Sequence, residues 1–158
     1  NLGFPLLDEG AEIIAPSRQV IPSTEVARSG LERWSRMEAP QPGYAEQVFY
    51  HEMAADASGY VTVALANRRA AGGRGLALYI RYRQRELPRF VEWKMMGHGD
   101  YVLGLEPANC WPGLGRAGER ARGTLEFLEP GEEREFAVEI GVLADNAAIE
   151  AMAKQIRR

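Results

Sequence analysis

Residues 90–113, FVEWKMMGHGDYVLGLEPANCWPG, contain two hydrophobic, β-prone runs separated by the glycine-containing turn GHGD at 97–100. A turn this short favours a β-hairpin, so residues 91–96 and 101–106 are expected to lie side by side. Side chains alternate between the two faces of a strand, so each run presents one set of residues to the core and another to the opposite face. This stretch therefore predicts an antiparallel sheet.

The second run of this hairpin ends in a carboxylate, Glu106, and Pro107 then stops the strand. A carboxylate beside Leu103 and Leu105 loses hydration unless it is paired or hydrogen-bonded. A general base needs a carboxylate in such a setting, although a solvated Glu at a strand end is the common alternative. Glu106 is the first candidate for a catalytic residue.

Short runs rich in Val, Ile, Leu, Tyr and Phe recur along the chain, separated by turns that contain Gly, Pro or Asp. They predict strands at residues 11–15, 45–51, 59–66, 74–83, 89–95, 100–106, 122–128 and 133–142. Regular turn spacing without βαβ alternation favours an all-β, antiparallel β-sandwich. In the last strand the alternation predicts a core row made of Phe136, Val138, Ile140 and Val142.

Two helical segments interrupt the strand pattern. Residues 24–37 have apolar side chains at helical spacing, with Ser23 or Thr24 as an N-cap, but Gly30 weakens the helix. The tail DNAAIEAMAKQIRR at 145–158 carries apolar residues on one face and begins with an Asp suited to capping. The sequence predicts one or two short helices beside the sheets.

Composition limits the classes of function. The chain has 158 residues, of which 46% are hydrophobic and 26% charged, enough for a single domain spanning 1–158 with its own core. The net charge of −3 argues against a nucleic-acid partner, because phosphate binding needs an excess of Lys and Arg. No apolar run reaches the roughly 18 residues of a membrane span, so no membrane partner is expected.

Cys110 is the only cysteine, so the chain has no internal disulfide and no thiolate cluster for zinc. A reducing, cytoplasmic location follows as the default expectation. His51 and His98 are far apart in the sequence, and no ligand spacing for a metal is recognisable. We expect no metal and no organic cofactor.

Four stretches carry a resemblance to a known family: NLGFPLLDEGAEI at 1–13, EQVFYHE at 46–52, the hairpin at 90–113, and LEFLEPGEEREFAVEIGVL at 125–143. Together they resemble the carboxy-terminal half of the aldose 1-epimerase-like DUF4432 family, of the galactose mutarotase-like superfamily. The resemblance implies a galactose mutarotase-like β-sandwich with a carbohydrate site on one concave face. It also implies that Glu106 occupies the position of the catalytic base.

The first residues are similar to the end of a family motif, His-x-Asn-x-Gly-x-Pro-Leu-Leu. In this match Asn1 takes a substrate-binding position, and the His that resembles the mutarotase acid would lie two positions before it. A sandwich without its amino-terminal part leaves sheet edges and a core face uncovered. We therefore expect either a homodimer or association with that amino-terminal part.

Further candidates surround Glu106 in the expected site. His51 falls between the acid and base motifs, as a His-containing strand does in the family, although a structural strand-end His is the alternative. Lys94 could hold sugar hydroxyls or a carboxylate, or be a surface lysine. Trp93 and Trp111 could stack on a pyranose ring, or Trp93 could belong to the core, and Asn109 could line the same pocket.

The resemblance implies a chemistry of one base and one acid. The base removes the proton of the anomeric hydroxyl, the acid protonates the ring oxygen, and the opened sugar recloses as the other anomer. The expected function is therefore interconversion of the anomers of a monosaccharide or sugar derivative. A non-catalytic carbohydrate-binding module and a structural sandwich domain are the alternatives, because a fold alone does not decide an activity.

Overall fold

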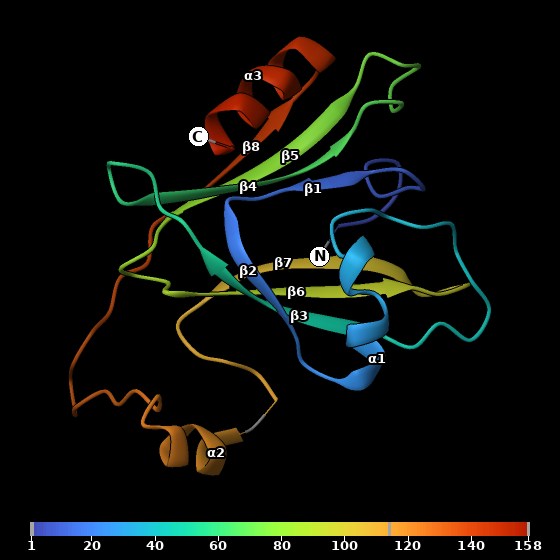
Figure 1. Ribbon diagram of the computed structural model, residues 1–158. Helices are drawn as coiled ribbons and strands as arrows, with labels where there is room; N and C mark the ends of the chain where they lie inside the picture. The colour runs from blue at the N-terminus through green and yellow to red at the C-terminus, as the bar shows by residue number, and fades with distance from the viewer. Residues whose placement is uncertain (1, 114, 158) are drawn as a thin grey trace.

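The computed structural model describes residues 2–113 and 115–157, and Figure 1 shows two sheets stacked face to face. Each sheet has four strands, and all the strand pairs are antiparallel. Sheet A has the order β2-β3-β6-β7 and sheet B the order β1-β4-β5-β8. The predicted all-β sandwich is confirmed.

The strands of sheet A are β2 (Ser17–Pro22), β3 (Gln47–Met53), β6 (Arg89–Met96) and β7 (Tyr101–Ala108). The strands of sheet B are β1 (Glu12–Ile14), β4 (Tyr60–Asn67), β5 (Leu76–Arg83) and β8 (Val138–Leu143). The expected hairpin joins β6 to β7, with Val91 opposite Glu106 and Lys94 opposite Leu103. The expectation that Pro107 stops the strand is wrong: Pro107 is opposite Phe90 and β7 continues to Ala108, which is possible because β7 is an edge strand. This register decides which side chains of the two strands share a face.

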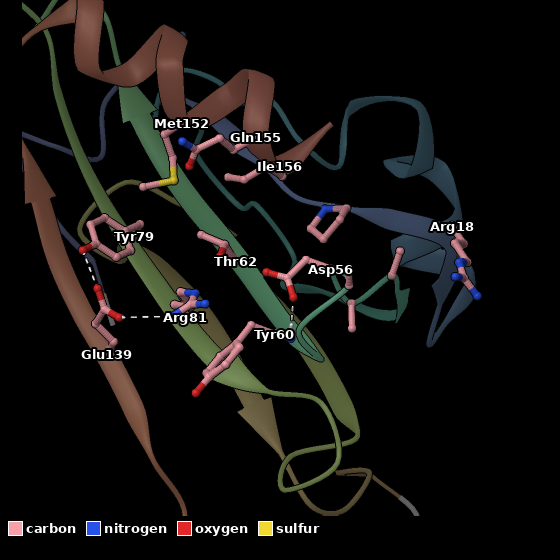
Figure 2. Close-up of a pocket in the computed structure, with 14 residues that line it drawn as sticks. Arg18, Asp56, Tyr60, Thr62, Tyr79, Arg81, Glu139, Met152, Gln155 and Ile156 are labelled. Atoms are coloured by element: carbon pink, nitrogen blue, oxygen red, sulfur yellow. Dashed lines mark hydrogen bonds and ion pairs between the residues drawn. The ribbon is translucent and has the colours of Figure 1, made fainter. Parts of the chain in front are cut away.

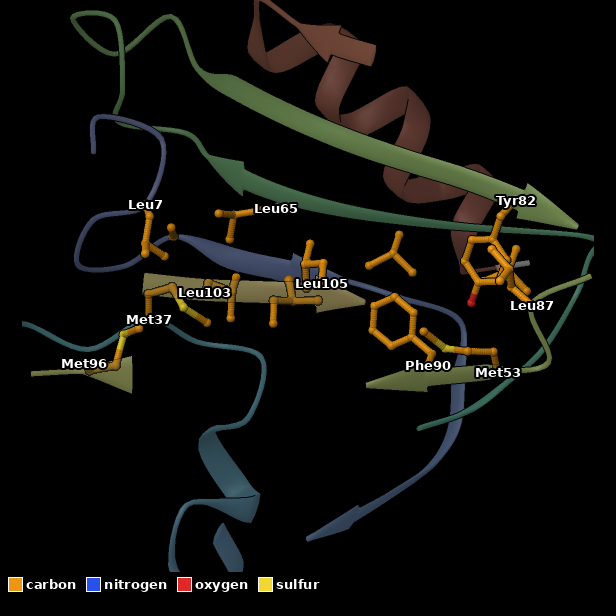
Figure 3. Packing of buried hydrophobic residues seen from close by; sticks show 14 residues of the cluster. Leu7, Met37, Met53, Leu65, Tyr82, Leu87, Phe90, Met96, Leu103 and Leu105 are labelled. Atoms are coloured by element: carbon orange, nitrogen blue, oxygen red, sulfur yellow. The ribbon is translucent and has the colours of Figure 1, made fainter. Parts of the chain in front are cut away.

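The core lies between the two sheets, as Figure 3 shows. Tyr82 of sheet B stacks on Phe90 of sheet A, with ring planes 8° apart and centroids 6.3 Å apart. Around this pair the core cluster contains the buried residues Leu7, Ala11, Ile13, Met37, Met53, Val61, Val63, Leu65, Leu87, Met96, Leu103 and Leu105. The side chains of sheet A that point away from this core form its outer face.

Helix α3 (Asn146–Ile156) covers the outer face of sheet B (Figure 1). Its buried face carries Ile149, Ala153 and Ile156, which pack on small residues of β4 and β5 such as Ala64 and Ala77. The Asp145 side chain accepts a hydrogen bond from the backbone N–H of Ala148 at 2.8 Å, which satisfies a free donor of the first turn. The predicted tail helix is confirmed.

The helix expected at 24–37 forms only in pieces. Helix α1 (Glu25–Ser29) starts at Thr24, whose hydroxyl accepts from the Ala27 N–H at 3.1 Å, and the 3-10 helix η1 (Leu31–Arg33) follows. The break falls at Gly30, where an added Cβ atom would lie 2.7 Å from Nε2 of Gln47. The Gln47 side chain of β3 therefore occupies the space that a side chain at position 30 would need.

The prediction of a strand at 122–128 is wrong. Helix α2 (Gly115–Arg122) ends there, and the chain then runs without regular structure until β8. A strand needs a neighbour for its ladder of hydrogen bonds, and no strand lies alongside this segment, in which Phe127 is 62% exposed. The strand expected at 133–142 correspondingly forms only from Val138.

The core position expected for Phe136, Val138, Ile140 and Val142 is also wrong, because their exposed fractions are 44%, 45%, 65% and 63%. The alternation itself is confirmed: β8 places Val138 and Ile140 opposite Tyr82 and Ile80 of β5. However, β8 is the edge strand of sheet B, and these side chains remain open to solvent.

None of the described helices has the length and apolarity required of a membrane span.

Candidate functional site

Glu106 lies on the outer face of sheet A, at the centre of a row of side chains. Tyr50 of β3 is opposite Val91 of β6, and Val91 is opposite Glu106 of β7, so all three share this face. Neighbouring strands are about 4.8 Å apart, which puts the Cα atoms of Tyr50 and Glu106 roughly 10 Å apart. The half-buried Glu106 carboxylate has no hydrogen-bond partner among the described residues.

Gly104 makes room for the Glu106 side chain. The carboxylate folds back along β7 over Gly104, where an added Cβ atom would lie 3.1 Å from Cδ of Glu106 and 3.3 Å from Cβ of Trp93. Trp93 is opposite Gly104 on β6, so the start of its side chain lies beside the carboxylate. The Nε1–H of Trp93 donates to Oε2 of Glu46 at 2.8 Å, which holds the ring on this face.

Trp111 comes to the same face from the loop that follows β7. Its ring lies 4.8 Å from the Tyr50 ring, and the guanidinium of Arg89 lies 5.2 Å from the Trp111 ring centroid. The hydroxyl of Tyr50 donates to the carbonyl oxygen of Pro112 at 2.8 Å and so ties the loop to β3. Burial raises the pKa of Tyr50, which keeps this hydroxyl a donor.

We use the term Glu106 face for Glu106, Gly104, Val91, Trp93, Tyr50 and Trp111. Tyr50 and Arg89 were missed from the sequence. The alternation of VFYHE places Tyr50 on the face opposite to His51, but only the pairing of β3 with β6 brings Tyr50 into the row of Glu106. Arg89 likewise needs the fold of the loop to meet Trp111.

Two other predicted residues lie at the end and edge of β7. Asn109 is half-buried just beyond the strand, between Ala108 and the exposed Cys110. Asn1 lies outside the described residues, but its neighbour Leu2 forms an antiparallel bridge with Leu103, the Leu2 N–H donating to the Leu103 oxygen at 2.8 Å. The start of the described chain therefore runs along the free edge of β7.

The structure does not bring His51 to Glu106. His51 is buried on the inner face of sheet A, 2% exposed, whereas Glu106 is on the outer face. Its Nδ1 lies 2.9 Å from Oγ of Ser17 and its Nε2 lies 3.2 Å from Oε2 of Glu92. These contacts assign His51 to an internal polar network, since the sheet itself separates it from Glu106.

Lys94 is also on the inner face of sheet A. It is therefore neither a surface lysine nor a residue of the sugar site around Glu106. It is fully buried, and its Nζ donates to the carbonyl oxygens of Arg33 at 2.8 Å and Arg36 at 2.7 Å. Glu38 lies 3.4 Å away as an ion pair. Burial lowers the pKa of Lys94, while the carboxylates of Glu38 and Glu92 raise it.

The inner network also contains a buried carboxylate, that of Glu92. Glu92 is fully buried, and burial raises its pKa above the ordinary value, opposed by the hydrogen bond from His51. Burial, with the charges of Glu38 and Glu92, raises the pKa of Tyr44 to about 12. Among the described residues, Oε1 of Glu92, the Tyr44 hydroxyl and Oε1 of Gln47 are buried without a hydrogen-bond partner.

A cavity of about 660 Å³ lies elsewhere, on the outer face of sheet B beside α3 (Figure 2). Its charged groups contact one another: the Tyr79 hydroxyl donates to Glu139 at 2.7 Å, and Arg81 lies 3.7 Å from Glu139 and over the ring of Tyr60. Asp56 accepts from the backbone N–H of Tyr60 at 3.0 Å. Because these groups already have partners, this cavity is a weaker candidate than the Glu106 face.

The described residues contain no cluster of three His, Cys, Asp or Glu side chains that could hold a metal ion. His98 is exposed at the tip of the β6–β7 hairpin, between two glycines. The concave pocket expected around Glu106 stays a prediction. The chemistry available on the Glu106 face is one carboxylate and the aromatic side chains that share its face.

The family comparison matches residues 1–142 to a domain of unknown function, DUF4432. The chain belongs to this family. The resemblance stated from the sequence is thus confirmed at family level, and its assignment to the carboxy-terminal half of DUF4432 proteins stays a prediction. A comparison with curated proteins found no match.

Among solved structures, this DUF4432 chain is similar to a Klebsiella pneumoniae protein described as a "putative aldose 1-epimerase". The two share 30% sequence identity and superpose with a TM-score of 0.86. The match covers 99% of this chain and 41% of the Klebsiella chain, so the DUF4432 chain spans about two-fifths of the length of that protein. The similarity confirms an aldose 1-epimerase-like fold.

Proposed function

We propose that this chain carries the carbohydrate site of an aldose 1-epimerase-like protein, with Glu106 as the general base. The observation that carries the proposal is the Glu106 face: a carboxylate without a described partner shares the outer face of sheet A with the aromatic side chains of Trp93, Tyr50 and Trp111. Aromatic rings stack on the apolar face of a pyranose and leave its hydroxyl groups to polar side chains. The similarity to the Klebsiella protein supports the same class of substrate.

The proposed reaction interconverts the anomers of a monosaccharide. Glu106 removes the proton of the anomeric hydroxyl while an acid donates a proton to the ring oxygen, and the C1–O bond to the ring breaks. Rotation about the C1–C2 bond and reclosure, with both proton transfers reversed, give the other anomer. The reaction uses no net proton, oxidant or reductant.

We place the acid upstream of Asn1, where the family motif has its His. The bridge between Leu2 and Leu103 supports this position. If the antiparallel register continues along β7, a residue two positions before Asn1 stands opposite Glu106 and shares its face. A proton donor there would be close enough to act on the same sugar as Glu106.

The alternative function is a non-catalytic carbohydrate-binding module. One observation favours it: among the described residues no histidine lies on the Glu106 face, since His51 is on the inner face and His98 is at the hairpin tip. A chain that binds a sugar without an acid opposite Glu106 would be a binding module. Binding and mutarotation therefore have to be measured separately.

The test compares the chain with Glu106→Gln, which keeps the shape but removes the base. Sugar binding is measured by saturation-transfer NMR over a panel of monosaccharides, and mutarotation by polarimetry, for the 158-residue chain and for a version extended upstream. In the extended version we expect Glu106→Gln to bind sugar and to lose about 10²–10⁴-fold in rate. Glu52→Gln, an exposed residue of the same sheet, is the matched control.

We expect the 158-residue chain alone to bind sugar and to be a poor epimerase. Equal rates in the two versions would show that the acid is His98, water or another group of this chain, and the upstream acid would be dropped. Binding without mutarotation in both versions would establish the binding module. Absence of binding to every sugar in the panel would overturn both functions.

A further inference from the structure

Arg89 brings a positive charge to the outer face of sheet A, beside Glu106. It is opposite Ala108 and two residues along β6 from Val91, the partner of Glu106. Residues two apart on a strand share a face, so Arg89 and Glu106 are diagonal neighbours, roughly 7–8 Å apart. The Glu106 carboxylate folds toward Gly104, which is the direction away from Arg89. Val91 thus lies between an anionic group and a cationic group.

The Arg89 guanidinium is unpaired in the part of the chain that the structure describes: no carboxylate there lies within ion-pair distance of it. By contrast, Arg68 contacts Glu12 at 2.9 Å and Glu150 at 2.8 Å. Arg89 instead lies over the Trp111 ring, 5.2 Å from its centroid, a contact that uses the face of the guanidinium and leaves its edge open. Such an edge binds a carboxylate or a phosphate through two parallel hydrogen bonds.

Helix α2 adds positive charge near the loop that follows β7. The helix carries three arginines and one glutamate, in a chain whose net charge is −3. Burial raises the pKa of Tyr50; of the two charges that act on its hydroxyl, that of Arg122 lowers this pKa and that of Glu119 raises it. Glu119 is buried and accepts a hydrogen bond from the Thr124 hydroxyl at 2.6 Å, whereas Arg122 is exposed. The end of the Glu106 face next to this loop is therefore its positive end.

We propose that the sugar of the Glu106 face is acidic: it carries a phosphate or a carboxylate at C6, and Arg89 binds this group. The inference rests on the proposed function, because it takes the anomeric hydroxyl to lie at Glu106. In a hexopyranose the ring oxygen and C5 separate C6 from C1, so a group at C6 extends beyond the reacting centre. With C1 at the Glu106 carboxylate and the ring over Val91, the group at C6 reaches the Arg89 guanidinium.

A neutral sugar would leave this guanidinium without an anion. Hydrogen bonds between charged groups typically change an affinity by roughly 10- to 100-fold, so Arg89 distinguishes an acidic sugar from its neutral parent. The same positive charge offsets the repulsion between the anionic group and the Glu106 carboxylate. The predicted substrate class is therefore a hexose 6-phosphate or a hexuronate.

NMR titration of the 158-residue chain tests the substrate class. The probes are glucose, galactose and mannose, their 6-phosphates, glucuronate, galacturonate and inorganic phosphate. We expect an acidic sugar to bind about 10-fold or more tightly than its neutral parent and than inorganic phosphate. Arg89→Gln is expected to abolish this preference without weakening the neutral sugar, and Arg89→Lys, which keeps the charge but not the paired donors, to retain part of it. Arg74→Gln, an exposed arginine between β4 and β5, is the matched control, and far-UV circular dichroism checks that all variants keep their strands.

Equal affinities for the neutral and the acidic sugars would overturn the inference and leave the proposed function standing. A preference that survives in Arg89→Gln would overturn the role of Arg89, and inorganic phosphate that binds as tightly as a sugar phosphate would show an anion site unrelated to sugar. Tighter binding of the 6-phosphate than of the hexuronate assigns a phosphate, and the reverse assigns a carboxylate. Absence of binding to every sugar, neutral or acidic, would overturn the proposed function itself, so the two failures are distinguishable.

Discussion

Glu106 keeps its position because the residue two places before it has no side chain. The carboxylate folds over Gly104, and an added Cβ atom there would lie 3.1 Å from Cδ of Glu106 and 3.3 Å from Cβ of Trp93. In a strand, residues two apart point to the same face, so residue 104 is the immediate neighbour of the Glu106 side chain. The absence of a side chain at Gly104 thus lets the carboxylate lie beside the start of the Trp93 side chain.

We predict that Gly104→Ala displaces the Glu106 carboxylate and weakens sugar binding at least 10-fold while the fold survives. The affinity is measured by NMR titration with the sugar that binds the parent chain best, and the fold by thermal unfolding. Gly3→Ala is the control, because an added Cβ atom at Gly3 has no neighbour within 4 Å. Unchanged affinity in Gly104→Ala would mean that the carboxylate position does not matter for binding.

Glu92 shows the opposite setting for a carboxylate. It is buried on the inner face with His51 and Lys94, and burial raises its pKa above the ordinary value of 4.5. A group with a raised pKa in the folded state binds its proton more tightly there than in the unfolded chain. Its contribution to stability is therefore complete below about pH 4.5 and is lost as the pH rises through the raised pKa.

We predict that the free energy of unfolding of the parent chain, relative to Glu92→Gln, decreases as the pH rises from about 4.5 to 7.5. The amide has no proton to lose, so it isolates the titration of this group. Urea unfolding at several pH values measures the difference, with the exposed Glu52→Gln as control. A difference that is constant over this range would show that the pKa of Glu92 is not raised in the folded state.

At the scale of elements, Lys94 connects strand β6 to the segment that contains α1 and η1. Its ammonium group donates to the carbonyl oxygens of Arg33 and Arg36, just after η1, and pairs with Glu38. The Arg33 oxygen also accepts from the Arg36 N–H at 3.1 Å, whereas the Arg36 oxygen, which lies beyond η1, accepts from the Lys94 ammonium group. The buried lysine thus serves as a cap for a segment with little regular structure.

We predict that Lys94→Met destabilises the chain by about 2–3 kcal/mol, because it leaves the Arg36 carbonyl oxygen without its donor and removes one of the two cationic partners of Glu38, the other being Arg33. Hydrogen exchange should become faster in residues 25–38 than in the strands of sheet B. Chemical unfolding and exchange mass spectrometry measure the two effects. Lys154→Met, an exposed lysine on α3, should be neutral, and a similar loss in that variant would refute the specific role of Lys94.

Several elements could be predicted from local pattern alone. The β6–β7 hairpin follows from GHGD between two β-prone runs, and α3 follows from its apolar face and the capping Asp145. The segment at 122–128 has a similar composition but forms no strand, because strand formation requires a partner that local sequence does not specify. The break at Gly30 needed the position of Gln47, which comes from β3.

At the scale of the molecule, sheet A covers only part of the inner face of sheet B in the described residues. Tyr82 and Phe90 stack between the sheets. Val138, Ile140 and Val142 of β8 lie on the same face of sheet B as Tyr82 but remain exposed. A continuous core face that is only partly covered accounts for both observations. The open edge explains why an apolar alternation that predicts a core strand can end at the surface in this chain.

The sequence by itself determined the class of the fold, the alternation of its strands, and Glu106 as a carboxylate in the strand that follows the GHGD turn. Only the tertiary structure decided which faces meet: His51 and Lys94 turn inward, whereas Tyr50, Trp93 and Trp111 join Glu106 on the outer face of sheet A. The physical reason is that a period of two defines two faces of a strand but does not say which one is covered. Coverage depends on the register and order of strands that are distant in sequence.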